Sequence, residues 1–133
     1  MNRIELGKRL VALRSELEIF GLSQYAIQSL EAGRSSYSVS NLFLYTDAIG
    51  CSVFVWDYNI DEHYRIGSMD DCHELIMFLM QQNKANINDM SSQIGIRYTK
   101  PKGGHTSLSI DTLLAILSYF HCLVQITKQH QWF

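Results

Sequence analysis

The chain has 133 residues, of which 47% are apolar and 18% are charged, and its formal net charge is −2. This composition fits one compact domain or two very small ones, and it excludes a disordered chain. No apolar run reaches the roughly 18 residues of a membrane span, and the charged N-terminus lacks the apolar core of a secretion signal, so we expect a cytoplasmic protein without membrane contacts.

The first part of the chain predicts helices. Asn2 and Glu5 can form a capping box before an apolar stripe that continues to Leu17. A second helix is expected from Ser23, a capping residue, to Gly33, because glycine favours the left-handed conformation that ends helices. These signals place two helices before residue 34.

A third helix is expected from a cap at Ser38 or Ser40 to about residue 50. The apolar pattern then changes to a period of two, which predicts a strand over residues 51–56. The acidic stretch that follows is too polar to be buried, and we interpret residues 59–69 as a link.

The same order of elements then returns. A helix is expected from Ser68 or Asp70, a shorter helix ends at Gly95, and a last helix starts at Ser109. A second strand is expected over residues 123–127. The same order of three helices and a strand is therefore expected twice along the chain.

Residues 38–55 match residues 109–126, which lie 71 positions later, with the apolar positions in register. The identical pairs are Ser38 with Ser109, Leu42 with Leu113, Cys51 with Cys122, and Val53 with Val124. Any two helix-then-strand segments share part of this pattern, which is the alternative explanation. We interpret the match as a duplication into a first unit (1–58) and a second unit (70–133), and two copies indicate a fused dimer rather than a solenoid.

Catalytic and metal-binding patterns are absent from the sequence. Cys51, Cys72 and Cys122 form no CxxC pair, and the ligand-type residues between Asp57 and His73 match no metal-binding spacing. No nucleotide-binding or hydrolase motif occurs. We therefore expect no enzymatic activity, no cofactor, no metal and no small-molecule substrate.

The stretch GLSQYAIQSLEAGR, residues 21–34, resembles the Cro/repressor-type helix-turn-helix family, also called the XRE family. LGKRLVALRSE at 6–16 is similar to the family's first helix, and AIG at 48–50 is similar to the end of its Ser-capped helix. The resemblance implies a DNA-binding transcriptional regulator, either a repressor or an antitoxin-type autoregulator. It also implies double-stranded DNA as the partner.

The two copies depart from the family pattern in opposite ways. Only one helix fits between residues 16 and 38, where the family has two, so the first copy lacks the helix that braces the recognition helix. In the second copy, residues 86–96 resemble that bracing helix, and a loop replaces the recognition helix. Each copy is therefore an incomplete helix-turn-helix unit.

The resemblance also suggests how the copies associate, because in some antitoxin members a strand after the last helix pairs with its twin. We expect a mainly α-helical pseudo-dimer with a small antiparallel two-stranded sheet, in which Cys51 and Cys122 lie at opposite ends and form no bridge. Phe54 and Trp56 would lie on the face opposite Val53, covered by the first helices; a partner or second subunit is the alternative.

Candidate DNA contacts follow from the second helix. Its exposed N-terminal turns would carry the base-contacting candidates Gln24, Tyr25, Gln28 and Ser29. Candidates for phosphate contacts are Lys8, Arg9, Arg34, Arg97, Lys100 and Lys102. The last three belong to the densest positive cluster, a loop that could follow phosphates or enter a minor groove, or could be a solvated surface loop.

Two functions stay open at this point. The negative net charge does not exclude a DNA-binding protein, because basic residues can gather on one face. The alternative is a degenerate helix-turn-helix scaffold that acts as a protein–protein interaction module without DNA binding. A protein partner or a homo-oligomer is compatible with either function.

Overall fold

A computed structural model describes residues 1–99 and 107–128 of the chain. Within these ranges the protein is a mixed α/β structure with six helices and three strands. The first unit contains α1 (Arg3–Arg14), α2 (Gln24–Ala32), α3 (Val39–Ala48) and β1 (Cys51–Asp57). The remaining elements are β2 (Glu62–Ile66), α4 (Met69–Gln82), α5 (Ile87–Ile94), α6 (Ile110–Tyr119) and β3 (Cys122–Lys128).

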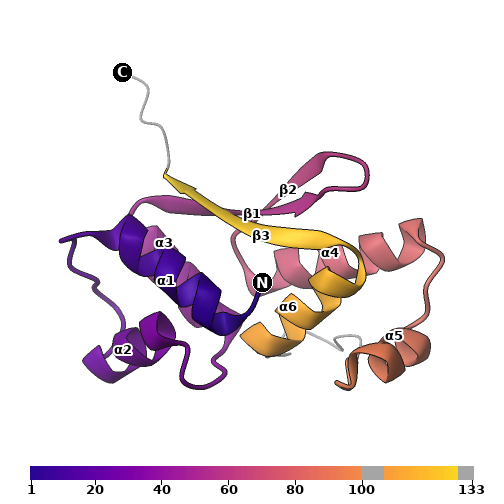
Figure 1. The fold of residues 1–133 in the computed structure, drawn as a ribbon, viewed down its shortest axis with the longest axis horizontal. Coiled ribbons are helices and arrows are strands. Elements are labelled where there is room, and N and C mark those ends of the chain that lie inside the picture. The colour runs from indigo at the N-terminus through magenta and orange to yellow at the C-terminus, as the bar shows by residue number, and fades with distance from the viewer. Residues whose placement is uncertain (100–106, 129–133) are drawn as a thin grey trace.

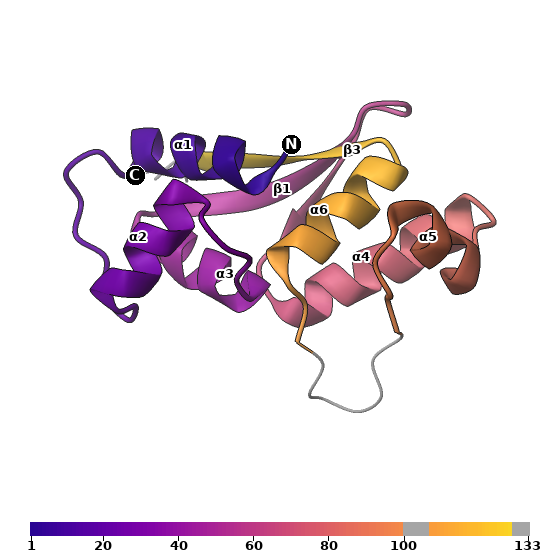
Figure 2. The ribbon, with the colours of Figure 1, turned by 60° about the horizontal axis from the view of Figure 1, so that its bottom comes forward.

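The strands form one antiparallel sheet in the order β2-β1-β3. In Figure 1 the sheet lies above the helices, so the helices cover one of its faces. Helices α1, α2 and α3 occupy one half of the molecule and α4, α5 and α6 occupy the other half, as Figure 2 also shows. None of the described helices is both long and apolar enough to cross a membrane.

The pairing of β1 with β3 follows the internal repeat. Phe54 lies opposite Gln125, and these two residues are 71 positions apart, like the copies of the repeat. The bridge between Ser38 and Ser109 joins a second pair with the same spacing. Two separate contacts therefore join a residue to its own counterpart, which is the arrangement that a local twofold axis produces.

Hydrogen bonds around the serine bridge obey the same relation. The Val39 N–H donates to the Leu108 carbonyl over 2.9 Å, and the Ile110 N–H donates to the Tyr37 carbonyl over 2.8 Å. Shifting the first bond by 71 residues gives the second. These paired contacts give the two segments the same local twofold relation as the strand pair, and their origin by duplication stays a prediction.

The turns before the two strands are also alike. Gly50 and His121, which again are 71 positions apart, have positive φ angles of 70° and 60°. Each turn is followed by a buried cysteine whose thiol donates to a carbonyl two residues earlier, from Cys51 to Ile49 and from Cys122 to Phe120. A histidine therefore keeps a backbone conformation that normally favours glycine.

The predicted helix caps are confirmed for most helices. The side chain of Asn2 accepts from the Glu5 N–H, and the side chains of Ser38, Ser68 and Ser109 cap α3, α4 and α6. The expected extension of the first helix to Leu17 is wrong. The helix ends at Arg14, and the Leu17 side chain is 51% exposed.

The prediction of a mainly α-helical fold with a two-stranded sheet needs correction, because the sheet has a third strand. Residues 62–66 form β2, which pairs with β1 through a short hairpin turn. This strand lies inside residues 59–69, which we interpreted as a link. Polar composition hid the strand, since Glu62, His63 and Arg65 are exposed and only Ile66 is fully buried.

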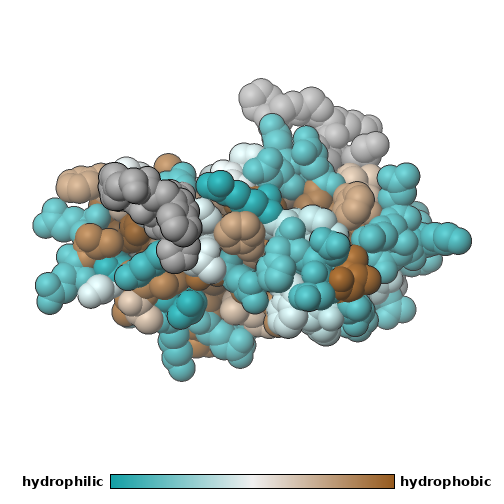
Figure 3. Space-filling view, turned by 90° about the horizontal axis from the view of Figure 1, so that it is seen from above, coloured by the Kyte–Doolittle hydropathy of each residue, from teal (hydrophilic) through white to brown (hydrophobic). Residues whose placement is uncertain are grey.

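The two faces of the sheet differ in their cover. Val53, Val55, Val124 and Ile126 point toward the helices, and all four are buried in the core. Phe54 and Trp56 alternate with these residues and are half-buried on the other face, so the prediction that the first helices cover them is wrong. Figure 3 shows small hydrophobic patches separated by hydrophilic residues on this side.

Trp56 is instead held by its own hairpin. Its indole N–H donates to the Asp61 carboxylate over 2.9 Å, and its ring stacks on His63 with 6.0 Å between the ring centroids. Tyr58 packs against the same ring at 5.8 Å. The hairpin thus supplies part of the cover that we expected from the helices.

The three cysteines are free and buried, and the antiparallel register separates Cys51 from Cys122 as expected. Cys51 lies opposite Lys128, and Cys122 lies opposite Asp57 at the other end of the strand pair. Burial raises the pKa of the Cys122 thiol to about 12, and nearby Asp57 adds to this effect. Burial, with a smaller effect of Asp71, also raises the pKa of the Cys72 thiol to about 12.

These shifts predict a loss of stability in alkali. Thiols of the unfolded chain have a pKa of about 8.5, so between about pH 9 and 12 the unfolded state binds fewer protons than the native state. The free energy of unfolding therefore falls as pH rises through this range. We expect a urea midpoint that declines above about pH 9 and a shallower decline for Cys72→Ala; equal pH profiles of both chains would contradict the assignment.

Candidate nucleic-acid interface

Helix α2 carries the predicted base-contacting residues. It begins after Ser23, whose hydroxyl accepts from the Ala26 N–H over 3.1 Å, and it ends at Gly33 in the left-handed conformation. Ile27 and Leu30 are buried. The predicted base-contacting side chains are exposed at Gln24, Tyr25 and Gln28 and half-buried at Ser29.

Close packing against α1 fixes the position of α2. A Cβ atom on Gly7 would lie 2.2 Å from the Glu31 carbonyl oxygen, which is closer than real Cβ contacts allow. A Cβ atom on Gly33 would lie 2.9 Å from the backbone of Arg3. Both helices therefore approach through glycine, and larger residues would push them apart.

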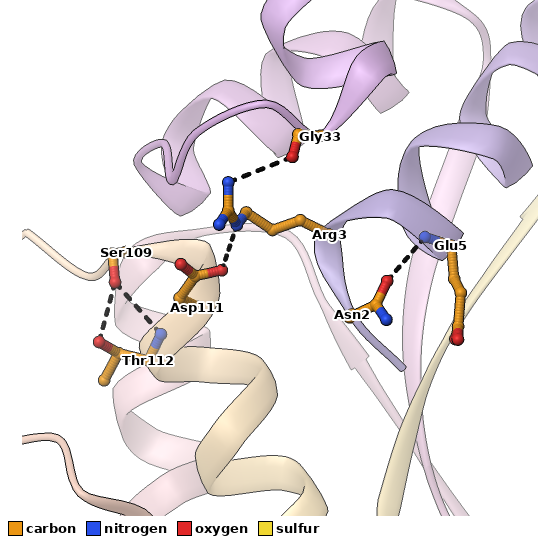
Figure 4. A network of polar contacts seen from close by, with 7 residues as sticks. All are labelled: Asn2, Arg3, Glu5, Gly33, Ser109, Asp111 and Thr112. Atoms are coloured by element: carbon orange, nitrogen blue, oxygen red, sulfur yellow. Dashed lines mark hydrogen bonds and ion pairs between the residues drawn. The ribbon is translucent and has the colours of Figure 1, made fainter.

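Arg3 connects this packing to the second unit. Its guanidinium donates to the Gly33 carbonyl over 3.2 Å and forms an ion pair with Asp111 at 2.6 Å (Figure 4). Asp111 belongs to the first turn of α6, whose cap Ser109 accepts from the Thr112 N–H. The end of α2 is thus tied to α6 across the boundary between the units.

A second polar network holds the exit of α2. Arg14 forms an ion pair with the Glu31 carboxylate at 2.6 Å, and the Tyr45 hydroxyl donates to the same carboxylate. Burial, with Glu31 as the next cause, raises the pKa of Tyr45 above its usual value. Glu31 therefore joins α1, α2 and α3, so its role is structural.

The predicted phosphate contacts do not all gather on one side. Arg34 is exposed just after α2, Arg97 is exposed just after α5, and Lys8 is exposed on α1. Arg9 instead lines a hollow with Leu6 and residues 124–127 of β3, so it lies toward the sheet. Lys100 and Lys102 lie outside the described residues, and Arg97 is the part of the predicted basic loop that the structure describes.

Helix α5 lies between α4 and α6 in the chain, as α2 lies between α1 and α3. The interpretation of α5 as the bracing helix of an incomplete unit stays a prediction. The exposed side chains of α5 are Asn88, Asp89, Ser92 and Gln93. In Figure 1, α2 and α5 lie at opposite ends of the molecule, on the side away from the sheet.

The ends of α2 and α5 carry similar sequence signals. Both helices begin after a capping residue and end at a left-handed glycine, Gly33 or Gly95, which is followed one or two residues later by an arginine. The caps of the two helices, Ser23 and Asn86, are 63 residues apart, whereas the main repeat has a spacing of 71.

Comparison with known proteins found no matching family model, no matching curated protein and no matching solved structure.

The glycine packing predicts an unusual result for Gly7→Ala. Alanine is favoured over glycine inside a helix by about 1 kcal/mol, so an open site would gain stability. Here the added Cβ meets the Glu31 carbonyl, and we expect a net loss of about 1–3 kcal/mol in urea unfolding. Gly67→Ala is the matched control, because its nearest neighbour is an Asp71 side-chain oxygen at 3.7 Å. Equal midpoints for both variants would contradict this packing.

The exposure of the two ion pairs predicts that they contribute differently to the free energy of unfolding. Glu31→Gln leaves the half-buried Arg14 without a countercharge, and we expect a loss of about 1–3 kcal/mol. Asp111→Asn removes the more exposed pair with Arg3, which is expected to cost about 0–1 kcal/mol. Urea titrations of both variants measure the difference, and a larger loss for Asp111→Asn would reverse the assignment.

Proposed function

We propose that the protein is a DNA-binding transcriptional regulator of the XRE type, a repressor or an antitoxin-type autoregulator, built from two degenerate helix-turn-helix-like units. One observation carries the proposal: α2 and α5 lie at the two ends of the face away from the sheet, in units related by a local twofold axis. The sugar-phosphate backbone of duplex DNA has twofold axes of its own, which suit a protein with this arrangement.

The chemistry of α2 supports this function. Its exposed N-terminal turns carry the amide side chains of Gln24 and Gln28, and glutamine can make paired hydrogen bonds to the edge of adenine. Tyr25 is 78% exposed beside them. Arg34 is exposed beyond the end of the same helix, where a guanidinium can hold a phosphate.

The contacts that hold α2 in place suit a helix that recognises bases. A helix that discriminates bases must keep its side chains in one position relative to the groove, and α2 is held by glycine packing against α1 and by the network around Glu31. The solvent-facing residues of α2 therefore project from a backbone that these contacts hold in position. That support is consistent with the proposed role of α2.

A protein-interaction module is the second candidate, and one observation favours it. Leu17 and Phe20 are 51% and 78% exposed in the connection between α1 and α2, close in sequence to the equally exposed Tyr25. Exposed apolar side chains of this size mark interaction sites in many proteins. Under this alternative the scaffold would bind a protein through the first unit and would not bind DNA.

Salt dependence separates the two functions. A DNA-binding protein that makes about four phosphate contacts loses roughly 100-fold in affinity when salt rises fourfold, because the released counterions oppose binding. We therefore expect duplex binding at low salt that falls steeply in a salt titration. Absence of binding at low salt would eliminate the DNA function and leave the interaction module.

Matched substitutions then test the assigned residues. Gln28→Ala is expected to relax sequence preference, whereas Arg34→Ala is expected to weaken binding to all duplexes and to reduce the salt slope by about 1. Arg65→Ala, on the exposed side of β2, removes the same charge from the sheet and serves as the control. Equal losses for Arg34→Ala and Arg65→Ala would count against the proposed face.

A further inference from the structure

The two reading ends of the molecule are not chemically equal. No acidic residue lies in the first turn of α2, whereas Asp89 lies in the first turn of α5. The Asn86 amide donates to the Asp89 carboxylate over 2.8 Å, and the Asn86 side chain in turn caps the helix. The exposed negative charge opposes close approach of a phosphate to this end, and nothing comparable exists in the first turn of α2.

The support behind the two helices also differs. Counted from the cap of each helix, the positions of the polar network in the first unit hold apolar residues in the second. Arg14, Glu31 and Tyr45 correspond to Met80, Ile94 and Ile116. At these described positions the second unit has no charged network like the one at the exit of α2. The exposed residues Gln24, Tyr25 and Gln28 of α2 correspond to Ile87, Asn88 and Ser91 of α5, of which only Asn88 is exposed.

We propose that one copy of this chain binds an asymmetric DNA site in a single orientation, with α2 reading bases in one half and the exposed Arg97, just after α5, contacting a backbone phosphate in the other half. This inference rests on the proposed function and specifies its partner. A homodimer presents two identical surfaces and therefore selects a palindrome. Two different ends inside one chain are complementary to two different half-sites.

A reversed orientation carries a penalty. It would move Gln24 and Gln28 away from the bases they recognise and would place the Asp89 end of α5 in the groove that α2 fits. Loss of one bidentate base contact alone reduces affinity by roughly 5- to 150-fold. The difference between the two orientations is large enough to be measured.

Tethered cleavage measures the orientation. The three native cysteines are buried, so a thiol-reactive iron chelate will label an introduced surface cysteine selectively. Ser35→Cys places the probe just after α2, and Ser92→Cys places it on α5; both serines are exposed. Each labelled full-length chain is bound to a duplex that the unmodified chain has selected from a random library, and the cleaved positions are mapped.

Each outcome decides a different question. We expect the α2 probe to cleave one end of the site, the α5 probe to cleave the opposite end, and the selected sequence to be non-palindromic. Cleavage of both ends by each probe, with a palindromic site, would overturn the single orientation while leaving DNA binding intact. If the unmodified chain selects no duplex even at low salt, the proposed function fails and this inference fails with it.

A pair of glutamine variants provides an independent readout. Gln28→Ala on α2 is expected to reduce discrimination in one half-site by roughly 5- to 150-fold, whereas Gln93→Ala on α5 should change it less than about twofold. Both side chains are exposed, so folding is expected to tolerate both changes. Equal losses of discrimination in the two halves would overturn the unequal roles of α2 and α5.

Discussion

The antiparallel pairing of β1 with β3 is the contact on which the remaining structure depends. Each unit contributes one strand with an apolar side, and a single strand can neither satisfy its backbone groups nor bury that side alone. When the strands pair with Phe54 opposite Gln125, the helices of both units come to lie under one sheet. The positions of α2 and α5 follow from this register.

The serine bridge fixes the second point of the same axis. The side chains of Ser38 and Ser109 each cap a helix. The backbones of the same two residues face each other in an isolated antiparallel bridge. Because the bridge and the strand pair are separate contacts, rotation of one unit against the other would break one of them. The two ends of the molecule are thus held in a defined relation to each other.

How far the sequence predicts this structure depends on whether a signal is local. Caps such as Asn2 and Ser109 and the apolar alternation of β1 and β3 depend on near neighbours, and they were predicted. Strand β2 was not, because its stability comes from pairing with β1 while its own side chains are mostly polar. The end of α1 at Arg14 was missed because a leucine at position 17 continues the apolar spacing without reaching the core.

The candidate site was predictable in one half only. The residues of α2 lie in a continuous motif, whereas the match of α5 to α2 is displaced by eight positions relative to the main repeat, and its residues share little identity with α2. The long-range ties of α2, from Gly7 to Glu31 and from Arg3 to Asp111, join residues far apart in the chain. No local pattern reports such contacts.

Covalent linkage allows the two units of the molecule to differ from each other. In a homodimer, a residue on the twofold axis faces its own copy, so it must be compatible with itself. In this chain a phenylalanine, Phe54, faces a glutamine, Gln125, at the axis of the strand pair, and only β1 carries an additional hairpin strand among the described residues. Once both halves are parts of one chain, a substitution in one is not repeated in the other. The same freedom applies to α2 and α5, so a single polypeptide permits unequal ends where a homodimer does not.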